Sequence, residues 1–252
     1  MDTILLDLEG TLYAEGEPIP GATAAVAALR EQGHVLRFLT NTDSKPLVRV
    51  AADLEGFGLR IQQEELFTPV VAAQRLLEAA GGNAYLVVAE ALRTEFKAVA
   101  CAPRTHVLVG DCRDTLDYSL LDGAFRALRA GAQLVALQRG RYFKRADGDH
   151  LDTGAVVAAL EYAAGCQAVV VGKPSAEFFT LAADSAGTPV TGCVVVGDDA
   201  TTDIVGGRAV GAVTVQVRTG KFADQQAEGL TGGASHTIDS IVDLPDLLAG
   251  PR

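Results

Sequence analysis

Short apolar runs, rich in β-branched residues and separated by segments of helical length, constrain the fold of this chain more than any other feature. They show little alternation of polar and apolar residues, which is typical of strands buried on both faces of a parallel sheet. Strands that alternate with helices predict an α/β fold with a doubly wound parallel sheet. The runs are Thr3–Leu8, Val35–Thr40, Ala84–Val88, His106–Gly110, Gln133–Leu137, Ala168–Gly172, Cys193–Gly197 and Val213–Val217.

Helix signals between the runs complete this pattern. Gly81-Gly82-Asn83 and Gly165-Cys166-Gln167 are the best candidate domain boundaries. We therefore expect a discontinuous core, residues 1–80 plus 168–252, and an inserted α/β domain, residues 81–167. The expected helices include Ala22–Gln32, Pro46–Glu55 and, after the N-cap and first-turn pair Thr68-Pro69, Val70–Ala80.

Composition excludes several classes of protein. The 252 residues carry a net charge of −11, which disfavours a nucleic-acid partner. The four cysteines form no C-x-x-C pair and the four histidines are scattered, so we expect reduced thiols, a cytoplasmic location and no zinc site. We expect no signal peptide, and no apolar run reaches the ~18 residues of a membrane span.

Acidic and polar side chains follow four of the apolar runs, where ligands bind in open α/β sheets. A carboxylate at Asp7 could attack phosphorus, and Glu9 could transfer protons. Thr40 and Asn41 could hold phosphoryl oxygens. Lys173 could neutralise their charge, with Pro174 starting a helix behind it. The acids Asp198, Asp199 and Asp203 suit Mg²⁺, which prefers oxygen ligands.

Each of these patterns also has an ordinary structural explanation. The acids could be solvated or could cap helix N-termini, Thr40 and Asn41 could form a helix cap, and Lys173 could be an exposed loop residue. The order of the four sites and their common placement at strand ends favour one convergent site.

Together the four sites resemble the motifs of the haloacid dehalogenase-like hydrolase superfamily. Further segments resemble its branch of NagD-type and 4-nitrophenylphosphatase-like enzymes, and most of all the phospholysine phosphohistidine inorganic pyrophosphate phosphatases and related hydrolase-domain-containing proteins. The motifs are Asp7-Leu-Glu-Gly-Thr11, Leu39-Thr-Asn41, Gly172-Lys-Pro174 and Gly197-Asp-Asp199 with Asp203; the further segments are Phe38–Thr42, Val171–Phe179, Val196–Asp199 and Val217–Phe222.

The resemblance implies a Mg²⁺-dependent phosphatase with a HAD-like Rossmannoid core and an inserted cap that often mediates dimerisation. It implies a small phosphorylated substrate and no membrane partner. It also assigns a role to each motif residue. Asp7 is the nucleophile and a metal ligand, Glu9 is the general acid/base and binds the metal through its carbonyl, and Asp198 is a further metal ligand. Thr40 and Asn41 bind the phosphate, Lys173 is the cation that orients Asp7 and the phosphate, and Asp199 and Asp203 bind or order the metal's waters.

Glu9 departs from the family pattern, in which Asp is common at this position. One extra C–C bond displaces the carboxylate by roughly 1.5 Å. Three interpretations stay open. Glu9 transfers protons, as its likeness to the Asp-x-Glu-Gly-Thr of enolase-phosphatases suggests; only its carbonyl serves the metal; or the protein binds phosphate or Mg²⁺ with little turnover. A metal-independent dehalogenase is a further alternative, which the acidic cluster disfavours.

The inserted region carries the most basic run of this acidic chain, Arg139–Arg145, just before Asp149–Gly154. The latter segment resembles a cap loop that faces the substrate. We therefore expect Arg139, Arg141, Tyr142 or His150 to contact the leaving group, whereas a solvated hairpin is the structural alternative. No G-x-G-x-x-G follows the first strand and no complete P-loop is present, which disfavours dinucleotide-dependent oxidoreductases and ATPases.

Overall fold

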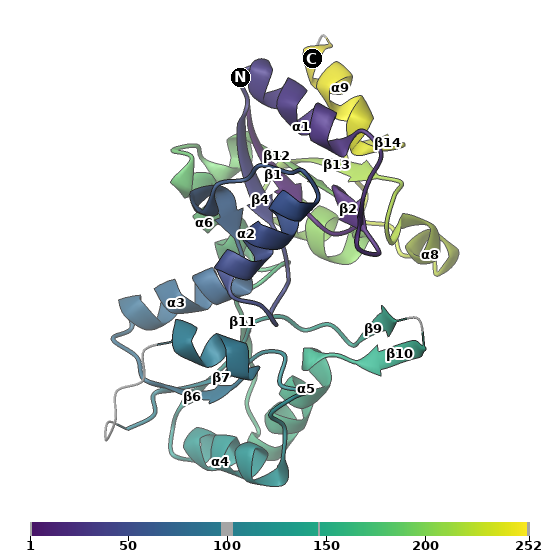
Figure 1. Ribbon diagram of the computed structural model, residues 1–252. Helices are drawn as coiled ribbons and strands as arrows, with labels where there is room; N and C mark the ends of the chain where they lie inside the picture. Colours follow the sequence, from purple (N-terminus) through teal and green to yellow (C-terminus); the bar gives the residue numbers. More distant parts are fainter. Residues whose placement is uncertain (1, 97–102, 146, 251–252) are drawn as a thin grey trace. The chain divides into compact units, whose positions relative to one another are not determined.

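The computed structural model describes residues 2–96, 103–145 and 147–250, which form two compact units (Figure 1). The first comprises Met1–Thr40, Val50–Phe67 and Lys173–Arg252, and the second comprises Asn41–Arg49 and Thr68–Gly172. The second unit is thus inserted into the chain of the first. These boundaries differ from the expected ones, because the helix that begins at Pro69 packs its buried residues Val70 and Ala73 into a cluster of the second unit.

A six-stranded parallel sheet forms the centre of the first unit. Its order is β14-β13-β12-β1-β4-β5, so β1 lies between β12 and β4. All five residues of β1 are buried, as expected of a strand covered on both faces. The strands are β1 (Thr3–Asp7), β4 (Val35–Leu39), β5 (Leu66–Phe67), β12 (Cys193–Gly197), β13 (Val213–Val217) and β14 (His236–Ile238).

Helices complete the core of the first unit. Phe178 and Phe179 on α6 are fully buried, and they contribute to the core together with Phe38 of β4. A short hairpin, β2 (Tyr13–Ala14) with β3 (Glu17–Pro18), follows β1. The helices are α1 (Ala22–Glu31), α2 (Leu47–Gly56, which begins within the second unit), α6 (Ala176–Ser185), α7 (Val205–Ala209), α8 (Phe222–Ala227) and α9 (Leu244–Ala249).

The second unit contains its own parallel sheet, in the order β11-β8-β7-β6. Alternate residues of β7 belong to two different hydrophobic clusters. Leu108 packs with residues of α3, whereas Val107 and Val109 pack with residues of α4 and α5. A hairpin, β9 with β10, precedes α5. The elements are α3 (Pro69–Ala79), β6 (Ala84–Val87), β7 (His106–Val109), α4 (Tyr118–Arg129), β8 (Gln133–Ala136), β9 (Tyr142–Arg145), β10 (Gly148–Leu151), α5 (Thr153–Ala164) and β11 (Val169–Val170).

Two local predictions need correction. The run Ala168–Gly172 was expected in the core, but its strand β11 pairs with β8 in the second sheet. The helix expected to start at Pro174 begins instead at Ala176, because Ser175 still has extended backbone angles.

The predicted helix cap at Thr68 is confirmed, since its hydroxyl accepts a hydrogen bond from the Val71 amide at 3.3 Å. None of the helices in the described part of the chain has the length and apolar character that a membrane span requires. Cys112, Cys166 and Cys193 are free thiols, and Cys101 lies outside the described residues.

Candidate active site

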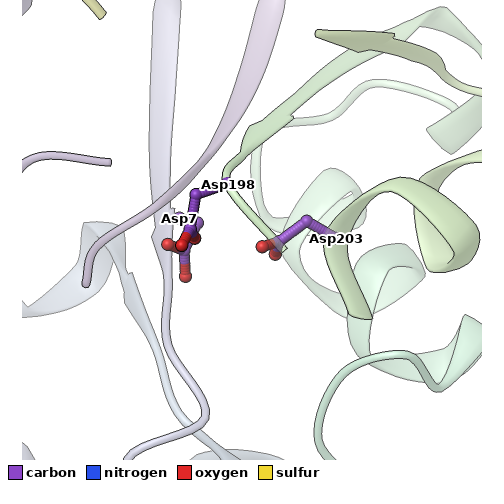
Figure 2. A group of neighbouring side chains, drawn as sticks. All are labelled: Asp7, Asp198 and Asp203. Carbon is purple, nitrogen blue, oxygen red and sulfur yellow. The ribbon is translucent and has the colours of Figure 1, made fainter. Parts of the chain in front are cut away.

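Three carboxylates converge in the first unit, and Figure 2 shows them directed toward one another. Asp7 is the last residue of β1, Asp198 directly follows β12, and Asp203 lies on the π-helical turn Ala200–Ile204. One oxygen atom from each lies within 4.8 Å of the others. All three side chains are buried, with exposures of 6%, 2% and 1%.

The fold explains why these acids meet. β1 and β12 run side by side in parallel register, with Leu6 opposite Val196, so Asp7 and Asp198 emerge at the same sheet edge. Gly10 adopts a φ of 91°, and a Cβ atom there would overlap the Asp198 carboxylate. The absence of a side chain at Gly10 therefore provides the space that the Asp198 carboxylate occupies.

Lys173 is the buried cation of this cluster. Its ammonium donates hydrogen bonds to Asp7 Oδ1 at 2.5 Å and to Asp203 Oδ1 at 2.7 Å. Burial alone would lower the pKa of Lys173, but the two carboxylates outweigh it and raise that pKa. Lys173 therefore remains charged and fixes the orientation of the Asp7 carboxylate.

Negative charge exceeds positive charge around Asp198. Burial raises the pKa of Asp198, and the neighbouring carboxylates of Asp7 and Asp203 raise it further. Burial and Asp7 likewise raise the pKa of Asp203, against the opposing effect of Lys173. A hard divalent cation among these oxygens would relieve this crowding, so the residues present fit Mg²⁺.

Asp199 has a different environment. Its Oδ1 accepts hydrogen bonds from the amide and hydroxyl of Thr201 and from the Gln225 amide group, at 2.8, 2.7 and 2.8 Å. Its Oδ2 pairs with the Lys221 ammonium at 2.9 Å. Burial would raise the pKa of Asp199, but Lys221 and these hydrogen bonds lower it. Asp199 thus caps the π-helical turn, and it is not among the three clustered carboxylates.

Thr40 and Glu9, two further motif residues of the first unit, follow the ends of β4 and β1. Thr40 is buried and follows Leu39, the residue that pairs with Asp7 between β4 and β1. Glu9 is exposed and forms a backbone bridge with Tyr13. Asn41, by contrast, begins the second unit.

Sequence reasoning missed several residues that contact the cluster. The Thr11 hydroxyl donates to Asp7 Oδ2 at 3.2 Å, and the Gln216 amide group donates to the Asp198 carbonyl at 3.0 Å. Thr11 belongs to the first motif, but its side chain was given no role. Lys221 lies in the Val217–Phe222 segment that supported the family resemblance. The sequence therefore drew attention to this segment, but it did not predict the hydrogen bond from the Lys221 amide to Asp198.

The cap residues lie on or near the β9–β10 hairpin. The Arg139 guanidinium pairs with buried Glu161 on α5 at 2.5 Å, a contact within the second unit. Arg141 is exposed, and Tyr142 is 45% exposed. His150 stacks on Phe143 with a centroid separation of 5.5 Å and contacts Asp147 at 2.9 Å. It also lines a cavity of about 430 Å³ in the second unit.

Comparisons with known proteins agree with this architecture. Family models match residues 4–101, described as haloacid dehalogenase-like hydrolase, and residues 170–244, described as HAD-hydrolase-like. Human phospholysine phosphohistidine inorganic pyrophosphate phosphatase is 34% identical over 97% of this chain and 93% of its own length.

Two solved structures are also similar. A p-nitrophenyl phosphatase from Archaeoglobus fulgidus has a TM-score of 0.89 and 27% identity, covering 98% of both chains. A glycerol phosphate phosphatase from Mycobacterium tuberculosis, in complex with magnesium, has a TM-score of 0.84 and 29% identity, covering all of this chain and 79% of its own. The sequence-based family prediction is confirmed: this chain belongs to the haloacid dehalogenase-like hydrolases.

Proposed function

We propose that this protein is a Mg²⁺-dependent phosphatase that hydrolyses a small phosphorylated metabolite through an aspartyl-phosphate on Asp7. The observation that carries the proposal is the cluster of buried Asp7, Asp198 and Asp203 beside the Lys173 ammonium. The relatives named as phosphatases support the same reaction class, and the magnesium complex of one of them supports the metal.

In the first step, an Asp7 carboxylate oxygen forms a bond to phosphorus while the bond from phosphorus to the leaving oxygen breaks. Lys173 holds Asp7 in place and offsets part of the negative charge. Glu9 gives its proton to the leaving oxygen. Thr40 and Asn41 hold the other phosphoryl oxygens. Mg²⁺, held by Asp7, the Glu9 carbonyl and Asp198, would supply charge stabilisation for the transferring group, with Asp199 and Asp203 ordering its waters.

In the second step, Glu9 takes a proton from a water molecule as the water oxygen bonds to phosphorus. The bond between phosphorus and Asp7 breaks, which releases inorganic phosphate and restores the carboxylate. The Lys173 contact with Asp203, at 2.7 Å, holds the ammonium beside Asp7, where it is placed to act in both steps.

The second unit is proposed to select the leaving group. Arg141 and Tyr142 are accessible on the β9–β10 hairpin, and His150 lines a cavity. Arg139 is a weaker candidate, because its guanidinium already pairs with Glu161. Homodimerisation through this unit and a reducing, cytoplasmic environment, which suits the free thiols, are further parts of the proposal.

The test is a panel of small phosphate esters assayed with Mg²⁺ and with EDTA, on wild type and on Asp7→Asn. An amide oxygen is a poor nucleophile toward phosphorus, so we expect Asp7→Asn to lose at least about 10³-fold in kcat. We expect EDTA to abolish wild-type turnover, and Asp184→Asn, at an exposed position of α6, to leave it unchanged.

Substantial turnover by Asp7→Asn would refute the mechanism. Turnover that is insensitive to EDTA would refute the metal requirement. A wild-type protein that binds Mg²⁺ but releases no phosphate from any ester in a single-turnover assay would instead be a binding protein.

A further inference from the structure

The turn that follows β13 contacts two segments of the candidate metal site. The Thr219 hydroxyl donates a hydrogen bond to the Gly10 carbonyl at 2.5 Å. The backbone amide of Lys221 donates to Asp198 Oδ2 at 2.7 Å. Residues 219–221, which we call the β13 turn, therefore hold both the loop after β1 and the carboxylate after β12.

Space in this region is tight. Gly220 adopts a φ of 59°, and a Cβ atom there would overlap the Asp198 carboxylate and lie 2.6 Å from Gly10 Cα. The β13 turn thus packs directly against Asp198 and Gly10. A small displacement of the turn would move the Asp198 carboxylate, because no gap separates them.

The Lys221 side chain anchors this turn. Its ammonium pairs with Asp199 Oδ2 at 2.9 Å, whereas the rest of the side chain is accessible, with 67% exposure overall. Asp199 is itself fixed, since Gln225 and Thr201 donate to its other oxygen. Among the described residues, no lysine or arginine side chain pairs with Asp198. One lysine thus contacts two adjacent acids in two ways: its ammonium binds Asp199 and its amide binds Asp198.

We infer that Lys221 is a positioning residue for the divalent-cation site: its ion pair with Asp199 holds the β13 turn in place, so that its amide orients Asp198 toward Asp7. The inference rests on the proposed function, which supplies the cation. Lys221 does not touch the reacting atoms in this role. Lys221 acts indirectly, by positioning Asp198 and the loop after β1 that contains Gly10.

Electrostatics alone predicts the opposite effect on metal binding. Lys221 is a positive charge near the cation site, and it neutralises Asp199. Removing that charge without moving any other atom would strengthen Mg²⁺ binding, because repulsion would fall. If the side chain positions Asp198, removing it weakens Mg²⁺ binding despite this electrostatic gain. The direction of the change therefore distinguishes positioning from simple charge.

The first experiment is calorimetric titration of the substrate-free protein with Mg²⁺. We expect Lys221→Met to raise the Mg²⁺ Kd by about 10- to 100-fold, the usual cost of losing a residue that orients a metal ligand. Lys221→Arg keeps the charge and should restore most of the affinity. Arg218→Met is the matched control, because Arg218 is nearby in sequence but pairs with exposed Asp239. A Kd for Lys221→Met that is unchanged or tighter than that of wild type would overturn the inference.

Hydrogen exchange of the metal-free protein provides a second readout. We expect Lys221→Met to speed amide exchange in residues 9–12 and 198–203, while Arg218→Met does not. Unchanged exchange in both segments would also overturn the inference, even for a protein that bound no Mg²⁺. Failure of the proposed function would appear separately, as a wild-type protein without Mg²⁺ binding or phosphate release.

Turnover adds a third comparison. Because the defect lies in metal binding, Lys221→Met should require more Mg²⁺ for half-maximal activity but recover most of its kcat at saturating Mg²⁺. Its KM for the ester should stay near that of wild type. A kcat that stays low at saturating Mg²⁺ would contradict a role limited to positioning.

Discussion

Glu9 and Asp7 lie two residues apart but in different surroundings. Asp7 is buried and held by Lys173 and Thr11, whereas Glu9 is exposed. A held carboxylate suits a nucleophile, which must keep one orientation. An exposed, longer side chain suits a group that moves protons to and from a leaving oxygen and a water molecule.

This contrast gives a prediction for Glu9. Glu9→Gln should lower kcat by about 10²- to 10⁴-fold, because an amide cannot deliver a proton. Glu9→Asp keeps an acid and should cost less. Both variants are assayed at saturating Mg²⁺, with the Mg²⁺ Kd measured in parallel. Equal losses in the two variants would show that only the Glu9 backbone contributes.

At the scale of elements, α7 depends on two consecutive glycines to approach its neighbours. A Cβ atom on Gly207 would lie 2.8 Å from Thr214 Cγ2 and 2.9 Å from Val195 Cβ, on β13 and β12. On Gly206 it would overlap the ring of Phe179 on α6. These contacts hold α7 against the sheet immediately after the turn that carries Asp203.

Gly207→Ala should therefore reduce the free energy of unfolding by about 1–3 kcal/mol, because overpacking outweighs the better helix propensity of alanine. Gly192→Ala is the control, since its Cβ would meet only Thr188 Cγ2 at an ordinary 3.5 Å. Urea denaturation measures both variants. If the two lose the same stability, the close approach of α7 is not the cause.

The sequence predicted the long elements well. β12 and β13 match the expected runs, and α1 differs from its expected range by one residue. Strands β5 and β14, of two and three residues, were missed because such short segments show no periodicity. The sheet to which β11 belongs was also missed, because its pairing with β8 depends on a contact between distant residues.

The candidate site, like the fold, was predicted from the sequence only in part. The order of the motifs predicted that Asp7, Lys173 and Asp198 would converge, and the structure places them together. Their chemical roles stay predictions. The contact of Lys221 with Asp198 and Asp199 was not predictable, because it depends on how the β13 turn packs rather than on a spacing along the chain.

At the scale of the whole molecule, buried Asp43 should make one separable contribution to the pH dependence of stability. Asp43 accepts a hydrogen bond from the Thr153 hydroxyl at 2.6 Å, and its side chain is buried. Burial, together with the nearby carboxylates of Asp152 and Asp111, raises the pKa of Asp43 to about 7, despite the opposing effect of hydrogen bonds from Thr153 and Gln138. The folded chain therefore retains a proton that the unfolded chain has already released.

The sign of the effect follows from this difference. Below the unfolded pKa of 3.8 both states are protonated, and the contribution of Asp43 is fully present. As pH rises toward 7 the unfolded state binds fewer protons than the folded state, so stability falls, by roughly 4 kcal/mol in total. The Asp43→Asn side chain cannot titrate, so the stability of this variant should lack the part of the decrease with rising pH that Asp43 causes.

Urea denaturation at several pH values between 4 and 8 tests this prediction. The difference in unfolding free energy between wild type and Asp43→Asn should shift steadily in favour of the variant as pH rises. Asp184→Asn, at an exposed position, should give a flat difference. If the difference in unfolding free energy between wild type and Asp43→Asn does not change with pH, the pKa of Asp43 is not raised in the folded protein.

The central position of β1 has a consequence for biosynthesis. Thr3 pairs with Val35 on one side and with Cys193 on the other, so one edge of β1 has no partner until about three quarters of the chain has been synthesised. The second unit ends at Gly172 and is complete before β12 exists. During synthesis on the ribosome, the inserted unit can therefore fold first. Until β12 is synthesised, the unpaired edge of β1 stays exposed, and such an edge favours aggregation.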